Sequence, residues 1–151
     1  MPAILFTAVL LLLPLQAVAG PKLFVFDCGS IRMDSLEMFG LEEGDSDVTD
    51  MFVPCYLVRH DKGLLLWDGG LPRSVADTDD PVVVDGGSMV YDTWIEDQLK
   101  AMGLSSADVT HAAYSHLHFD HAGAANYFLE SEVLMQRSEW DAAFAEDAEY
   151  I

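Results

Sequence analysis

The stretch Ser115-His116-Leu117-His118-Phe119-Asp120-His121-Ala122-Gly123 decides the fold of this chain. It places three of the five histidines within six positions, in the order His-x-His-x-Asp-His. The apolar residues before it predict a strand, and side chains two positions apart at the end of a strand point the same way. His116 and His118 can therefore share one metal ion. Asp120 and His121 follow as the loop turns, so they can serve a second ion.

The composition of this cluster also predicts a metal. Three imidazoles and a carboxylate packed side by side without an ion would lose hydration and gain few partners. Imidazole and carboxylate ligands suit Zn²⁺, with Mn²⁺ or Fe²⁺ as alternatives. The two isolated histidines, His60 and His111, are instead expected to be hydrogen-bonded core residues.

Apolar periodicity predicts a mixed α and β chain around the motif. Asp61-Lys62-Gly63 is a turn signal that joins two strands into a hairpin, and the second arm is apolar enough to be buried on both faces. Asp68-Gly69-Gly70 ends that arm and lets backbone pass close to a site. The expected strands cover residues 22–26, 52–59, 64–67, 109–114 and 133–136; the expected helices cover 91–102, 124–128 and 138 onward; the expected loops cover 30–50 and 68–87.

Two cysteines, Cys28 and Cys55, each lie beside a predicted strand. Two cysteines cannot make a disulfide scaffold, and neither has metal-ligand spacing. We expect a pair of buried thiols, because the flanking residues have core character. A single bridge is the alternative if the two strands are neighbours in an oxidising compartment.

The first twenty residues, MPAILFTAVLLLLPLQAVAG, carry no charged side chain and end in an Ala-x-Ala pattern. This layout predicts a secretory signal peptide over residues 1–20, cleaved near Ala19, with an uncleaved membrane anchor as the alternative. Residues 21–151 then form the N-terminal portion of one domain. A periplasmic or secreted location follows, without stable membrane association after cleavage.

The formal net charge of −19 is carried entirely by the segment after residue 20. Such a surface repels phosphate backbones and anionic lipid headgroups. Nucleic-acid binding is therefore not expected. A neutral small molecule captured by a metal is an easier substrate than a polyanion.

The central motif resembles the signature of the metallo-β-lactamase superfamily, and the flanking sequence resembles its N-acyl-homoserine lactonase branch, the quorum-quenching lactonases. The resemblance implies an αββα sandwich, of which this chain would supply the N-terminal half, an α+β fold truncated before its end. The matching stretches are Phe26-Asp27-Cys28-Gly29, Val53-Pro54-Cys55-Tyr56-Leu57-Val58, Leu66-Trp67-Asp68-Gly69-Gly70, residues 115–123 and Gln136-Arg137-Ser138-Glu139-Trp140.

The resemblance also implies roles for single residues. His116 and His118 would bind the first metal, Asp120 and His121 the second, and Asp68 would orient a ligand histidine from behind. The family's remaining ligands, a third histidine on each metal and a bridging aspartate, would follow Ile151. The 151-residue chain alone is therefore expected to be inactive.

The implied reaction is opening of the lactone ring of N-acyl-homoserine lactones by a hydroxide held between two Zn²⁺ ions. Asp120 would pass the hydroxide proton to the departing alkoxide. Met33, Met38 and Phe39 are candidates for an apolar groove around the acyl chain, with ordinary packing under a loop as the alternative. Hydrolysis of a β-lactam or thioester, or an inactive metal-binding fragment, are the competing interpretations.

Overall fold

The computed structural model describes residues 20–145. The predicted signal peptide, apart from Gly20, and the end of the last predicted helix lie outside the described residues. Within residues 20–145, no helix has the length and apolar character to cross a membrane. The elements in chain order are β1 (Lys22–Met33), η1 (Glu37–Phe39), β2 (Asp50–His60), β3 (Gly63–Trp67), α1 (Arg73–Ala76), β4 (Val82–Val84), β5 (Gly87–Val90), α2 (Ile95–Ala101), η2 (Ser106–Asp108), β6 (His111–Tyr114), α3 (Phe119–Ala122), η3 (Ala125–Tyr127), β7 (Glu132–Met135) and α4 (Arg137–Ala143).

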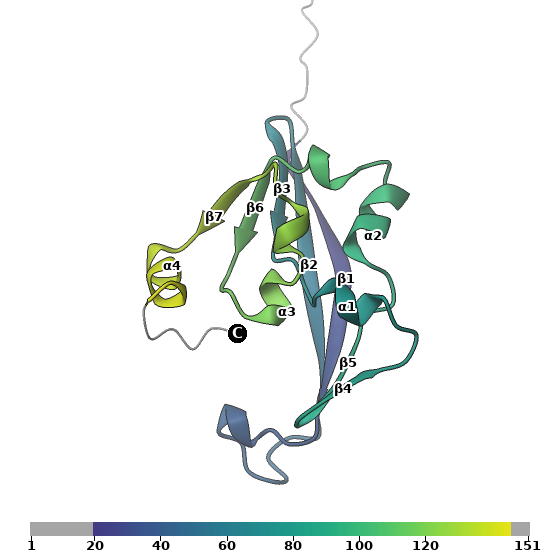
Figure 1. Ribbon diagram of the computed structural model, residues 1–151, viewed down its shortest axis with the longest axis vertical. Coiled ribbons are helices and arrows are strands. Elements are labelled where there is room, and N and C mark those ends of the chain that lie inside the picture. Colours follow the sequence, from purple (N-terminus) through teal and green to yellow (C-terminus); the bar gives the residue numbers. More distant parts are fainter. Residues whose placement is uncertain (1–19, 146–151) are drawn as a thin grey trace, which may run out of the picture.

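The strands form one seven-stranded mixed sheet in the order β4-β5-β1-β2-β3-β6-β7 (Figure 1). β1, β2 and β3 are antiparallel neighbours, whereas β6 is parallel to β3 and β7 is parallel to β6. Because the C-terminal ends of parallel strands meet at one edge, the loops after β3 and β6 lie together. These are the loops that carry Asp68 and the histidine motif.

One face of the sheet is covered by α1, α2 and the segment around η3, and the core lies between them (Figure 1). Side chains alternate along each strand, so every second residue of β1, β2 and β3 enters this core. α1 contributes one buried side chain and α2 contributes two. The buried residues are Phe26, Cys28, Val53, Cys55, Leu57, Leu64, Leu66, Leu71, Val75, Met89, Tyr91, Trp94, Ile95, Leu99, Val109, Ala112, Tyr114, Ala124 and Phe128.

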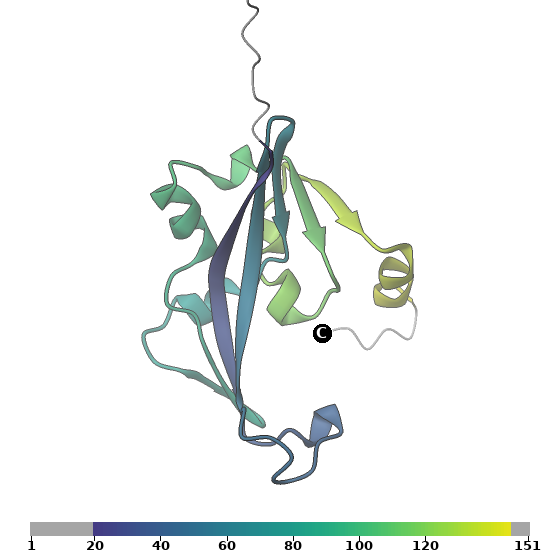
Figure 2. The ribbon, with the colours of Figure 1, turned by 180° about the vertical axis from the view of Figure 1, so that it is seen from behind.

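The opposite face of β1, β2 and β3 is apolar but exposed, and no described helix crosses it in the view from behind (Figure 2). Cross-strand pairing aligns two apolar rows on this face, Leu23 with Val58 and Leu65, and Val25 with Tyr56 and Trp67. Trp67 is 45% exposed, so the expectation that its strand is buried on both faces is wrong for this chain. The six residues are called the outer apolar face below.

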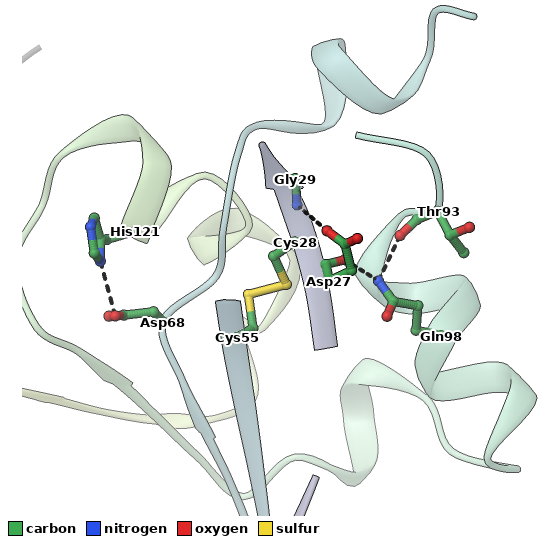
Figure 3. The surroundings of a disulfide bond; sticks show 8 residues. All are labelled: Asp27, Cys28, Gly29, Cys55, Asp68, Thr93, Gln98 and His121. Carbon is green, nitrogen blue, oxygen red and sulfur yellow. Dashed lines mark hydrogen bonds and ion pairs between the residues drawn. A yellow bond between two sulfur atoms is a disulfide. The ribbon is translucent and has the colours of Figure 1, made fainter. Parts of the chain in front are cut away.

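β1 is much longer than the strand expected at residues 22–26. Its register with β2 shifts between Asp27 and Ser30, where Gly29 takes a φ of 116°. The Asp27 carboxylate accepts a hydrogen bond from the Gly29 amide at 3.0 Å, and Gln98 of α2 donates to the Asp27 carbonyl at 2.6 Å (Figure 3). The predicted strand end is therefore a bulge, after which β1 pairs with both β2 and β5.

Three further boundaries differ from the sequence prediction. The expected loop over residues 68–87 contains α1 and most of the β4–β5 hairpin, whose short strands lack a strong apolar period. The predicted helix over residues 91–102 begins only at Ile95. The predicted helix over residues 124–128 is a short 3-10 turn, and the helical turn α3 lies earlier, over part of the motif itself.

Cys28 and Cys55 form a disulfide, so the expectation of two thiols is wrong (Figure 3). Their Cα atoms lie 5.8 Å apart, and both side chains are fully buried. The pairing follows from the bulge, because Cys28 comes directly after the strand positions that pair with β2 around Cys55. Sequence alone did not reveal which strands are neighbours.

Candidate metal centre

The four predicted ligands converge at the C-terminal end of β6. One donor atom from each of His116, His118 and Asp120 lies within 4.8 Å of the other two. The His116 and His121 ring centroids are 4.0 Å apart, and His121 Nε2 lies 3.4 Å from Asp120 Oδ2. Asp120 is therefore within reach of both histidine groups. The division of these ligands between two ions remains a prediction.

Local backbone structure explains this convergence. β6 ends at Tyr114, and α3 begins at Phe119 with His118 as its extended N-cap residue, at φ −65° and ψ 153°. His118 thus lies on extended backbone, and a donor atom of His116 in the segment after β6 lies within 4.8 Å of one from His118. Asp120 and His121 lie on the first helical turn, which brings their side chains to the same place from another direction.

Asp68 supports the histidines from the adjacent strand. It is only 5% exposed and has a φ of 60°, the left-handed conformation that few residues other than glycine adopt. Its carboxylate accepts hydrogen bonds from the Ser115 amide at 2.8 Å and the Ser115 hydroxyl at 3.0 Å, and it lies 2.9 Å from His121 Nδ1 (Figure 3). This contact would let Asp68 orient His121, and the role implied by the resemblance stays a prediction.

The hydrogen-bond network assigns which ring nitrogens are available. A carboxylate only accepts, so His121 Nδ1 carries the proton that it donates to Asp68. The Ser115 hydroxyl donates its single proton to Asp68 and can accept from His116 Nδ1, which lies 3.1 Å away. In the neutral tautomer that donates through Nδ1, each ring would leave Nε2 as the nitrogen available to a metal. This arrangement fits a Zn²⁺ site, in which a carboxylate or hydroxyl behind the histidine fixes its tautomer.

Electrostatics at His116 also favour metal binding. Burial lowers the pKa of His116 below its ordinary value of 6.5, and the neighbouring His121 and His118 lower it further. Asp120 and Glu139 act in the opposite direction. Because a metal binds neutral imidazole, a lowered pKa reduces competition from protons.

The loop after β3 is held between the disulfide and the motif. Leu71 N donates to the Cys28 carbonyl at 3.1 Å, and Gly123 N donates to the Gly70 carbonyl at 2.9 Å. Gly70 has a φ of 67°, and a Cβ there would overlap Cys28, whereas a Cβ on Gly123 would overlap the backbone of the loop after β3. Only glycine allows the three segments to approach this closely.

A groove of about 560 Å³ extends from the histidine cluster. Met33, Met38 and Phe39, the candidates for an acyl-chain groove, line it as expected from the sequence. All four predicted metal ligands also line it, together with apolar residues of β1, β2 and β5. The cluster therefore lies at the wall of a largely apolar groove that could hold a small molecule.

Sequence reasoning misplaced or missed several residues. His60 and His111 are surface residues with 40% exposed side chains rather than core residues, although both have hydrogen-bond partners. Ser115 and Glu139 were given no role. Ser115 directly precedes the motif, which was a usable signal, but Glu139 approaches a backbone amide across 22 positions, which leaves no local pattern.

The fold and the ligand cluster match a known family. The profile described as the metallo-beta-lactamase superfamily matches residues 48–146. The chain belongs to this superfamily. The seven-stranded sheet with helices on one face is one β layer and one α layer of its αββα sandwich, which confirms the fold expected from the sequence.

Characterised relatives belong to the lactonase branch that the sequence suggested. The chain is 33% identical over 132 residues to N-acyl homoserine lactonase AttM of Agrobacterium fabrum, covering 83% of this chain and 49% of the relative. It is 34% identical over 95 residues to N-acyl homoserine lactonase AiiA of Bacillus thuringiensis subsp. kurstaki, covering 59% of this chain and 38% of the relative.

Solved structures that resemble this chain are also N-acyl homoserine lactone hydrolases. A quorum-quenching N-acyl homoserine lactone hydrolase superposes with a TM-score of 0.66 at 29% identity, covering 86% of this chain and 51% of the other. An N-acyl homoserine lactone hydrolase with the product N-hexanoyl-L-homoserine at its catalytic metal centre superposes with a TM-score of 0.62 at 27% identity, covering 86% and 54%. The chain thus spans about half the length of the relatives it matches.

Proposed function

We propose that the protein carrying this chain is a metal-dependent hydrolase that opens the lactone ring of N-acyl-homoserine lactones. The observation that carries the proposal is the position of the His116, His118 and Asp120 donor cluster at the wall of an apolar groove. The cluster suits the polar lactone and the groove suits an acyl chain. In one similar structure, a product of this class is bound at the metal centre.

Each motif residue has a proposed task. His116 and His118 would hold one Zn²⁺ through ring nitrogens, and Asp120 and His121 would hold a second. When bound, the ions would lower the pKa of a water molecule and polarise the lactone carbonyl. Mn²⁺ or Fe²⁺ would be compatible with the same donors.

Asp120 is the proposed catalytic residue of this chain. Its carboxylate lies between the histidine groups, within 3.4 Å of His121 Nε2, and it faces the groove. It can accept the proton of the attacking water and deliver it to the ring oxygen as the C–O bond breaks. Proton transfer would then need no external base.

Apolar residues opposite the cluster are proposed to bind the acyl chain. Met33 lies at the end of β1, and Met38 and Phe39 lie in and around η1, the short turn between β1 and β2. Methionine side chains adapt to irregular apolar ligands, so this wall can follow a flexible chain. A neutral acyl chain also avoids the charge repulsion that the acidic surface imposes on anions.

The test measures lactone ring opening by pH-stat titration of the acid that hydrolysis releases. N-hexanoyl-homoserine lactone would be offered to the chain and to the longest product of its reading frame, each with added Zn²⁺ and after chelation. We expect metal-dependent turnover from a form with a complete ligand set. A parallel panel would contain a β-lactam, a thioester and an unsubstituted lactone. Selective turnover of the β-lactam or thioester would refute the lactonase proposal.

Matched variants sharpen this test. Asp120→Asn should reduce kcat by at least about a hundredfold, because general acid–base groups contribute about 10² to 10⁴ in rate. Asp85→Asn removes the same charge from another residue that lines the groove, outside the predicted ligand motif, and should change kcat little. Equal losses in both variants would contradict a catalytic role for Asp120.

We also propose that the protein is exported to the periplasm or beyond. The disulfide supports this location, because buried bridges persist in oxidising compartments. Fractionation of cells and mass spectrometry of the mature N-terminus would test it. Cleavage near Ala19 is expected, and an intact N-terminus in the cytoplasmic fraction would refute the proposal.

A further inference from the structure

Glu139 joins the last described helix to the metal loop. It lies in the first turn of α4, which follows the edge strand β7 and has no buried residue among the described ones (Figure 1). The Leu117 amide nitrogen donates a hydrogen bond to Glu139 Oε1 at 3.0 Å. A carboxylate that accepts from a backbone amide forms a charge-assisted bond, about twice as strong as a neutral one.

The Leu117 amide lies in the backbone between two predicted metal ligands. Leu117 lies between the ligands His116 and His118, and its N–H belongs to the peptide plane that joins it to His116. Fixing this plane restricts the backbone rotation on either side of it. The relative orientation of the two imidazoles, whose ring centroids lie 4.6 Å apart, then depends on where Glu139 holds the plane.

Regular secondary structure does not provide this support. The β6–β7 ladder ends at the pair Tyr114 and Met135, and α3 begins only at Phe119. The segment between them is therefore outside both elements while it carries two predicted ligands. A buried or half-buried amide in such a segment needs a partner, and Glu139 supplies it.

We propose that Glu139 is a positioning residue for the metal centre. Its carboxylate holds the peptide plane that joins His116 to Leu117, so that the rings of His116 and His118 both face one ion. The proposal rests on metal binding at the proposed site but not on the lactone substrate. A protein that binds metal and fails to open lactones would leave it intact.

Four variants separate the contact from charge and helix stability. Glu139→Met keeps the side-chain length and removes the acceptor, whereas Glu139→Gln keeps an acceptor oxygen and removes the charge. Glu139→Asp keeps the charge on a side chain that is one methylene shorter. Asp141→Asn removes one charge from the same helix at a residue that is 64% exposed and lies 4.0 Å from Arg137.

Two measurements are made on each variant of the full-length protein. Titration with Co²⁺ monitors affinity and the ligand-field spectrum, and amide hydrogen exchange monitors Leu117 directly. In Glu139→Met we expect the dissociation constant for Co²⁺ to rise about 10- to 100-fold, as for other supports behind ligands. Leu117 exchange should accelerate, and Glu139→Gln should retain most of the affinity.

Three outcomes would overturn the proposal. The first is a Glu139→Met variant with wild-type Co²⁺ affinity and spectrum. The second is an equal loss in Asp141→Asn, which would indicate a general charge effect. The third is an equal loss in Glu139→Gln. If Glu139→Met fails to fold, Glu139→Asp answers the same question, because the shortened carboxylate should lose Leu117 and weaken Co²⁺ binding while preserving the charge.

Discussion

Asp68 has a left-handed backbone conformation, and its carboxylate contacts both Ser115 and His121. It lies directly after β3, whereas Ser115 lies directly after β6 and His121 lies in α3. Asparagine tolerates the same backbone, so conformation and chemistry can be separated at this position.

The variant Asp68→Asn should fold and yet bind metal poorly. Its amide keeps one acceptor oxygen but cannot accept from Ser115 and His121 as a carboxylate does, so the orientation of His121 is lost. We expect about a 10- to 100-fold weaker affinity for Zn²⁺, measured by competition with a chromophoric chelator. Asp61→Asn, at the exposed hairpin tip, is the control. Wild-type affinity in Asp68→Asn would contradict the assigned role.

Tyr91 provides a prediction on pH. Burial raises the pKa of its hydroxyl above the ordinary value of 10, since the side chain is only 2% exposed. The unfolded state therefore releases its proton first, so stability from this group is complete below pH 10 and declines as the pH rises above it. Tyr91→Phe keeps the ring contact with Trp94 and should reduce this alkaline loss. Urea unfolding at pH 7 and pH 11 would measure it, and an unchanged difference would contradict it.

At the scale of single residues, the sequence predicted the four ligands because they lie within six positions. The supporting residues could not be predicted in the same way. Asp68 was recognised through a family resemblance, and its contact with His121 spans 53 positions. Glu139 acts on a backbone amide, which any residue at position 117 other than proline would provide.

Among the connecting elements, the loop after β3 is held on two sides. It is hydrogen-bonded to β1 on one side and to the motif on the other. Its geometry therefore links the disulfide to the proposed ligands.

Replacing Gly70 with alanine should destabilise the protein severely. The left-handed φ costs about 1 to 2 kcal/mol for a residue with a Cβ, and overlap with Cys28 adds about 1 to 3 kcal/mol. Gly103→Ala is the matched control, because Gly103 has a similar φ of 72° but no atom within 4 Å of an added Cβ. Unfolding in urea should show the larger loss in Gly70→Ala. Equal losses would mean that close packing contributes nothing.

Reduction of the disulfide should lower the free energy of unfolding by about 3 to 4 kcal/mol, as the chain-entropy relation gives for a loop of this length. Urea unfolding of the wild type and of Cys28→Ser/Cys55→Ser would measure the loss. A phosphine reductant, added to both proteins, should lower the urea midpoint of the wild type only. A midpoint that does not move in either experiment would contradict the predicted contribution.

Element prediction succeeded for one of the two local hairpins. The β2–β3 hairpin has its turn signal and both apolar arms within one short stretch, and its structure is close to the prediction. The extension of β1 was missed because β1 pairs with β5 more than fifty positions away, and the sequence does not display that pairing. The β4–β5 hairpin is local, and it was missed although Asp85-Gly86 between its strands is a turn signal.

For the whole molecule, the outer apolar face contrasts with a net charge of −19. The αββα architecture places a second sheet against such a face. The isolated 151-residue chain presents the face to solvent, where it forms a contiguous apolar patch.

We therefore expect this isolated chain to bind a hydrophobic dye and to self-associate. Val25→Lys, on the outer apolar face, should reduce dye fluorescence and association in sedimentation experiments. Val83→Lys is the control, because Val83 is 80% exposed but lies in β4 at the sheet edge. Equal effects of both substitutions would show that the patch is not the cause.

The closeness of the four ligands in sequence has a consequence for biosynthesis. Because residues 116–121 need little chain closure to meet, an ion can be captured while much of the sheet is still unformed. Asp68 and Glu139, which join from distant segments, would then tighten a site that already holds its ion. The order of assembly would make metal availability during folding, rather than afterwards, the factor that sets how much of the protein matures.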